Sequence, residues 1–130
     1  VTVPDPAAIT DAYATIKITS KIQSFIHLLL NMTKNEKEAQ LIFEKINKVA
    51  QANIGGGLKL NLIGNLPADK VVSTSIKQRT LFTNDAPNSL ASIDMKRIVN
   101  NLVYKMERKV LKNDTNKSFG SFFKRIIEQF

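Results

Sequence analysis

Few residues of this chain have side chains that could perform catalysis. The sequence has 130 residues, with a single histidine, His27, and no cysteine. The lack of cysteine excludes disulfides, thiolate metal sites and a thiol nucleophile. Paired carboxylates, a His-Glu-x-x-His motif and a Gly-x-Ser-x-Gly motif are also absent. Because no acidic, histidine or cysteine residue lies close to His27 in the sequence, we expect it to be structural. We therefore expect no catalytic residue and no metal ligand in this chain.

The glycine run at residues 55–57 is not a phosphate-binding loop. It lacks the Gly-Lys-Ser/Thr that follows in such loops. It also comes after an expected helix, whereas a phosphate-binding loop comes before one. We interpret these glycines as the end of that helix.

Polar and turn-forming residues follow three apolar segments. These loops are Pro4-Asp5-Pro6, Asn31-Met32-Thr33 and Pro67-Ala68-Asp69. Ligands of open parallel sheets bind beyond the carboxyl ends of the strands. If the three segments are neighbouring strands, the loops share one edge of the sheet, and a ligand is expected there.

The elements that must position these loops alternate between strand and helix. The predicted strands are Val1–Val3, Phe25–Leu30, which is apolar on both faces as in a buried parallel strand, and Leu58–Leu66. Connections this long predict an α/β fold, a parallel sheet with right-handed crossovers and flanking helices. Three strands are few, and the first starts at Val1 without a methionine, so we expect a piece of a longer protein.

Four helices are predicted from apolar spacing and capping residues. Asp5 caps the first, with Pro6 as its first residue. The second runs from about Glu36 to Ala52, capped by Thr33 or Asn35 and ended by Gly55. The last two are a short helix that Asp69 caps and that ends near Gln78, and a long helix that Asp85 introduces.

Four segments, in this order, resemble the MinD/ParA family of deviant P-loop ATPases. Within it they are most similar to the FlhG group, MinD-like regulators of flagellar number and placement. The segments are residues 1–17, Asn31-Met32 with Glu36-Lys37-Glu38-Ala39, residues 63–72 with Ile76-Lys77-Gln78-Arg79, and Pro87-Asn88-Ser89-Leu90-Ala91-Ser92. The resemblance covers about residues 1–107. It implies the C-terminal half of a P-loop NTPase fold, followed by a C-terminal amphipathic helix.

The resemblance implies a nucleotide site that this chain completes only in part. Family members hydrolyse ATP with an N-terminal phosphate loop and switch aspartates that organise Mg²⁺, and this sequence has neither. We therefore expect ATP or ADP with Mg²⁺ in the parent protein, an ATPase, and no tight nucleotide binding by this chain alone.

By the same resemblance, Asn31 faces the adenine edge, to which an amide offers a donor and an acceptor. Pro67 and Asp69 belong to the turn that packs against the base and ribose. Two alternatives stay open, since Asn31 could be a strand-end turn residue and Asp69 is also the natural helix cap.

The last 13 residues, 118–130, have an amphipathic pattern. Apolar residues at helical spacing form one face, which Lys124 and Arg125 border: Phe119, Phe122, Phe123, Ile126, Ile127 and Phe130. Such a helix is too short to span a bilayer but can lie at its surface. We expect a membrane-targeting helix after a basic, polar linker at residues 108–117. The alternative is that this face packs on the domain or on a partner protein.

The net charge of +8, concentrated from Lys105 to Arg125, favours an anionic partner. An anionic membrane is expected, and nucleic acid is not, because no motif that reads it is present. The resemblance further implies an ATP-dependent homodimer, the flagellar GTPase FlhF and flagellar switch or C-ring proteins as partners. It implies a cytoplasmic protein, peripheral at the inner face of the cell membrane. Alternative functions are a free-standing, non-enzymatic adaptor and a MinD-type regulator of the cell-division site.

Overall fold

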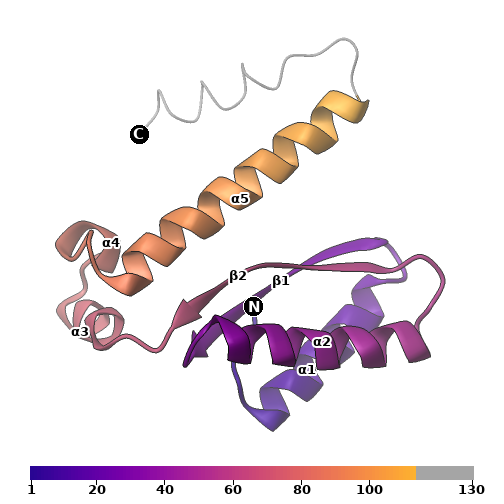
Figure 1. Ribbon diagram of the computed structural model, residues 1–130, viewed down its shortest axis with the longest axis horizontal. Coiled ribbons are helices and arrows are strands. Elements are labelled where there is room, and N and C mark those ends of the chain that lie inside the picture. The colour runs from indigo at the N-terminus through magenta and orange to yellow at the C-terminus, as the bar shows by residue number, and fades with distance from the viewer. Residues whose placement is uncertain (114–130) are drawn as a thin grey trace. The chain divides into compact units, whose positions relative to one another are not determined.

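The computed structural model describes residues 1–113, with side chains as far as residue 107 (Figure 1). Strands β1 (Phe25–Thr33) and β2 (Lys59–Pro67) form a parallel sheet. The other elements are α1 (Pro6–Thr19), α2 (Glu36–Asn53), α3 (Lys70–Gln78), α4 (Phe82–Asp85) and α5 (Leu90–Asn113). The predicted α/β class is confirmed. The chain divides into two compact units within α5, after Ile98.

The first predicted strand is reduced to one parallel bridge on the free side of β1. The Thr2 amide donates to the Leu29 carbonyl (3.0 Å), and the Thr2 carbonyl accepts from the Asn31 amide (2.8 Å). The pairing stops there because Pro4 has no N–H and the Val3 carbonyl accepts from Asp5 (2.8 Å) to begin a turn. In the described part of the chain, β1 is therefore the middle of three parallel segments.

Helices α1 and α2 begin at predicted caps. Asp5 Oδ1 accepts from the amides of Ala7 (2.9 Å) and Ala8 (3.1 Å), with Pro6 as the first helical residue. Of the two candidates for α2, Asn35 is the cap, since its Oδ1 accepts from the Glu38 amide (2.9 Å). Glu38 in turn accepts from the Lys34 amide (2.7 Å), which completes a reciprocal cap.

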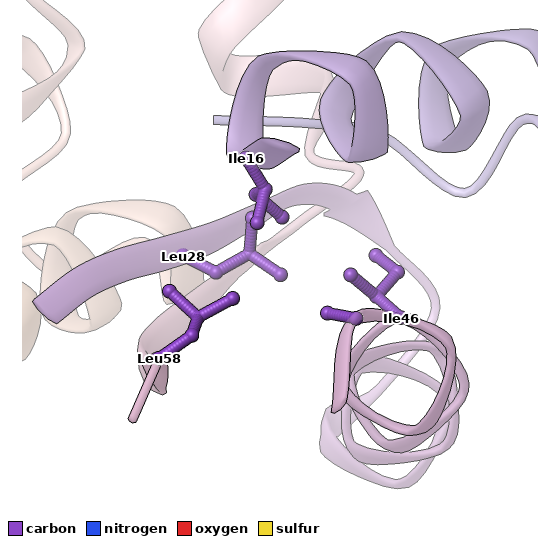
Figure 2. Packing of buried hydrophobic residues seen from close by; sticks show 5 residues of the cluster. Ile16, Leu28, Ile46 and Leu58 are labelled. Atoms are coloured by element: carbon purple, nitrogen blue, oxygen red, sulfur yellow. The ribbon is translucent and has the colours of Figure 1, made fainter. Parts of the chain in front are cut away.

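The core lies on the face of the sheet that α1 and α2 cover. Figure 2 shows Ile16 of α1, Leu28 of β1, Ile46 of α2 and Leu58 converging there. Each of these residues is at most 5% exposed. Both helices belong to right-handed crossovers that run in the same direction across the sheet, so they lie on the same face.

The opposite face of β1 is less covered than its sequence predicts. Leu28 and Leu30 are buried, whereas Leu29 is half-buried and Phe25 is 37% exposed. The prediction of burial on both faces is therefore wrong for the described part. On this second face His27 Nδ1 lies 3.1 Å from the side-chain Nδ2 of Asn61, and the His27 ring is edge-on to Phe25.

The start of the long helix differs from its prediction. Asp85 ends the short helix α4, and α5 begins at Leu90. Ser89 is at its start, since its Oγ accepts from the Ser92 amide (3.2 Å). The physical reason is Pro87, which disfavours helical backbone at Ala86 and so separates Asp85 from the helix. No helix within residues 1–113 combines the length and apolar character needed to cross a bilayer.

Candidate functional site

The carboxyl ends of β1 and β2 open onto a pocket of about 520 Å³. It contains all three residues that the sequence places at a nucleotide base, Asn31, Pro67 and Asp69. The remaining lining is mostly apolar: Met32, Leu66, Ala68, Lys70, Val72, Ser73, Ile76, Phe82, Ala91 and Met95. The loop Pro4–Pro6, also expected at this edge, is not among the lining residues. Whether this pocket binds a nucleotide stays a prediction.

Thr33 fixes the two strand ends against each other. It is fully buried, its hydroxyl donates to the Leu66 carbonyl (3.2 Å), and its Oγ1 accepts from the side-chain amide Nδ2 of Asn65 (3.0 Å). Its carbonyl also accepts from the Ala68 amide (3.1 Å), so the pairing of β1 continues to Thr33 rather than ending at Leu30. The sequence gives no signal for this network, because its members are more than 30 residues apart.

The amide group of Asn31 can offer its nitrogen as a donor to a ligand in the pocket. Its Oδ1 accepts from the Met32 amide (2.9 Å), and this bond identifies which terminal atom is oxygen. Met32 itself has a φ of 58°, a left-handed conformation that is unfavourable for a residue with a side chain. Met32 lies where the register of β1 and β2 shifts, and this irregular backbone places the Asn31 side chain at the carboxyl end of β1, where it lines the pocket.

Asp69 connects two helices that form opposite walls of the pocket. Its Oδ1 accepts from the Val71 amide (2.9 Å), which caps α3 as predicted. Its Oδ2 accepts from the Ala91 amide (3.4 Å) in the first turn of α5. A single carboxylate therefore lies at two helix N-termini, where a negative charge is favourable.

The hydroxyl groups of Ser89 and Ser92 hold together the wall of the pocket that α4 and α5 form. Ser92 is fully buried, and its Oγ donates to the Phe82 carbonyl (3.2 Å) of α4. The hydroxyl of Ser89 donates to Ser92 Oγ (2.9 Å). These bonds place Phe82 of α4 beside Ala91 and Met95 of α5 in the pocket wall.

The chemistry of the pocket suits a flat, mostly apolar ligand with a few polar atoms on its edge. Apolar surfaces cover the faces of such a ligand, and an amide fixes its orientation. Within residues 1–113, no three acidic or histidine side chains gather in a way that could hold a metal ion. The predicted membrane-binding residues lie outside the described residues: Phe119, Phe122, Phe123, Lys124, Arg125, Ile126, Ile127 and Phe130.

Comparison with known proteins identifies two relatives, while no protein-family model matches the chain. Over 128 residues, 98% of the chain, it is 38% identical to the flagellum site-determining protein YlxH of Helicobacter pylori, of which it spans 43%. Over 96 residues, 72% of the chain, it is 28% identical to the antiactivator FleN of Pseudomonas aeruginosa, of which it spans 34%. The chain thus spans less than half the length of the curated relatives it matches.

Proposed function

Because the chain belongs to the FlhG/MinD-like family, we propose that it forms the base-binding part of a nucleotide-dependent regulator of flagellar number and placement. The relative YlxH is named a flagellum site-determining protein, which supports the flagellar role, and FleN is named an antiactivator, which supports a regulatory one. The observation that carries the nucleotide role is the pocket at the carboxyl ends of β1 and β2, where Asn31, Pro67 and Asp69 meet.

The residues of this pocket fit the base of ATP or ADP and not its phosphates. The Asn31 amide can donate to a ring nitrogen of adenine, and Pro67 with Leu66 offers apolar surface to the ring. The sequence has no phosphate-binding loop, so Mg²⁺ and the phosphates would be held by residues of the parent protein outside this chain. Bound ATP would supply the hydrolysable phosphate bond that makes the regulator switchable.

The base-binding proposal is tested in the natural protein that contains this chain. Replacing Asn31 by Ala removes one hydrogen bond to the base, and we expect roughly 5- to 30-fold weaker binding of a fluorescent ATP analogue. Asn84→Ala is the matched control, since Asn84 is exposed on α4 and does not line the pocket. Flagella per cell, counted by electron microscopy, should change with Asn31→Ala and not with Asn84→Ala. Unchanged ATP binding in Asn31→Ala would contradict the role of this pocket.

We further propose that residues 118–130 target the protein reversibly to the inner face of the cell membrane. This rests on the sequence pattern of four phenylalanines and two isoleucines bordered by Lys124 and Arg125. An ATP-dependent homodimer would present two such segments, and two linked weak sites bind far more tightly than one. FlhF and switch or C-ring proteins are the proposed flagellar partners.

Sedimentation with anionic liposomes in ATP tests the membrane role. The double variant Phe123→Glu, Ile127→Glu should stay in the supernatant, because two charges on the apolar face make its insertion unfavourable. If the variant sediments as the natural protein does, the segment is not the membrane anchor.

The size of the natural protein separates this function from a free-standing adaptor. An immunoblot of the source cells with antibodies to residues 117–130 should show a band well above 14.5 kDa. A band near 14.5 kDa would instead leave no place for the phosphate-binding residues and would favour the adaptor. A change in division-site position rather than in flagella would favour the cell-division alternative.

A further inference from the structure

The end of the sheet opposite the pocket carries an exposed surface that combines isoleucine and lysine. Here the turn after α1 meets the segment that leads into β2, and the Lys59 amide donates to the Ser24 carbonyl (2.7 Å). Figure 1 shows the two connections side by side at the amino ends of β1 and β2. The amino-end patch is defined here as Lys17, Ile18, Lys21, Ile22, Phe25 and Lys59.

The apolar members of the patch are exposed to an unusual degree. Ile18 is 68% exposed and Ile22 84% exposed, whereas Ile16, two residues before Ile18 on α1, is buried in the core. Phe25 adds a ring that is 37% exposed at the start of β1. A single exposed apolar side chain needs no explanation, but several at the same end of a sheet, near exposed lysines, favour an interaction surface.

The two stretches of chain that meet at this end contain no acidic residue. Residues 12–35 and 45–68 have neither Asp nor Glu, but they include six lysines. Lys17, Lys21 and Lys59 of the patch are all exposed. The patch therefore presents positive charge beside exposed apolar side chains, without carboxylates from its own stretches to neutralise it.

We propose that the amino-end patch rests on an anionic phospholipid bilayer, with Ile18 and Ile22 among the acyl chains and the lysines against the headgroup phosphates. A bilayer surface places apolar chains and negative charge within a few ångströms of each other, which matches this combination. Nucleic acid would pair with the lysines but leave the isoleucines in water. A stable protein interface needs roughly 800 Å² from each partner, more than six side chains at one end of a sheet provide.

This contact lies in residues 17–59 and is separate from the membrane segment proposed at residues 118–130. Each contact alone is weak, and two weak contacts on one protein reinforce each other strongly. The contact also needs no nucleotide, so it can be tested apart from the base-binding proposal.

The first experiment measures flotation of the full chain with vesicles, in a Phe123→Glu, Ile127→Glu background that disables the C-terminal segment. The probe is vesicles of phosphatidylglycerol and phosphatidylcholine, compared with phosphatidylcholine alone. The patch variant Lys21→Gln, Ile22→Gln should lower partitioning to the anionic vesicles by roughly tenfold or more. The matched control is Lys37→Gln, Leu41→Gln, which alters an exposed lysine and a 51% exposed leucine on α2.

Circular dichroism of both variants should show unchanged folding, because all four substituted side chains are exposed. Equal partitioning of the two variants would overturn the proposal. Binding of duplex DNA or of an acidic protein, lost only in the patch variant and without vesicle binding, would also overturn it.

A second measurement uses the absence of tryptophan from the sequence. In the same background, Ile22→Trp introduces a single fluorophore whose emission should shift to the blue with anionic vesicles and be quenched by brominated lipid. Leu41→Trp should show neither effect. An Ile22→Trp emission that stays at its value in water would contradict insertion of this turn.

Discussion

Asp69 shows how one side chain can set the geometry of a whole pocket. Its carboxylate accepts from Val71 (2.9 Å) on one wall and from Ala91 (3.4 Å) on the other. The residues between Val71 and Ala91 in sequence form the rest of α3, then α4 and its connections. The carboxylate is therefore a positioning group for the pocket, and this geometry leaves a direct ligand contact of Asp69 as a prediction.

Replacing Asp69 by Asn should lower the free energy of unfolding by about 1–2 kcal/mol. The amide keeps one acceptor oxygen, but its NH₂ group faces one of the two backbone N–H groups and repels it. Urea denaturation of the full chain measures the change. Asp85→Asn is the control, because Asp85 is exposed at the end of α4, and it should change the free energy by less than about 0.5 kcal/mol. Equal effects of the two substitutions would show that the bond to Ala91 contributes nothing.

At this scale the sequence predicts local contacts and not distant ones. Asp5, Asn35 and Asp69 could be predicted as caps because each bonds to amides two or three residues away. The bonds of Thr33 to Leu66 and Asn65 could not be predicted, since they depend on the register of two strands. Of the candidate site, the sequence therefore identified the residues at the strand ends, and it missed the network that orients them.

At the scale of elements, Gly64 permits close contact between β2 and α5. A Cβ at this position would lie 2.5 Å from Ile98 Cγ1, and the backbone has a φ of +155°. Gly64 pairs with Leu29 just after the register of the sheet shifts, so it lies on the face opposite Leu28. The start of α5 thus packs on the second face of the sheet at a point where no side chain fits.

Gly64→Ala should therefore lower the free energy of unfolding by about 2–4 kcal/mol, because the new methyl group and the Ile98 side chain overlap. Gly57→Ala is the control, since φ is +93° there and no atom lies within 4 Å. It should lose only about 1 kcal/mol through backbone strain. Adding Ile98→Ala to Gly64→Ala should show positive coupling in a double-mutant cycle. Additive losses would mean that the two residues do not meet.

The end of β1 and the start of α5 show why the boundaries of helices and strands are hard to predict from the sequence. Asn31 and Met32 have turn character in the sequence, and the register of the sheet does shift there, yet the hydrogen bonds of Asn31 to Thr2 and of Thr33 to Ala68 extend the strand as far as Thr33. Asp85 has the right chemistry for a cap, yet Pro87 moves the start of α5 to Leu90. Element type and order followed from local pattern, whereas the ends depended on tertiary pairing and on one proline.

At the scale of the whole molecule, the described core is built on one face of a small sheet. Ile16, Leu28 and Ile46 come from three different elements and bury one another (Figure 2). Two-stranded sheets are stable only when such packing supports them. The integrity of residues 1–98 therefore depends on a few side chains at the centre of this face.

Leu28→Ala should lower the free energy of unfolding by about 2–5 kcal/mol, through lost burial and the cavity left behind. Leu28 is 4% exposed, and Leu41, 51% exposed on α2, provides the control. Leu41→Ala should change the free energy by less than about 1 kcal/mol. Thermal melts followed by circular dichroism give both values. Loss of helix and strand signal at one temperature would show that the strands and helices unfold together, and separate transitions would contradict a shared core.

Because the Ala91 amide donates to Asp69, the amide proton of Ala91 reports the distance between the two helices that line the pocket. An amide proton held against a carboxylate resonates downfield in an NMR spectrum and exchanges slowly with deuterated solvent. A ligand that wedged the start of α5 away from α3 would stretch this bond, move the Ala91 resonance upfield and speed its exchange. A ligand that drew the two walls together would do the reverse, so this one peak distinguishes opening of the site from closing.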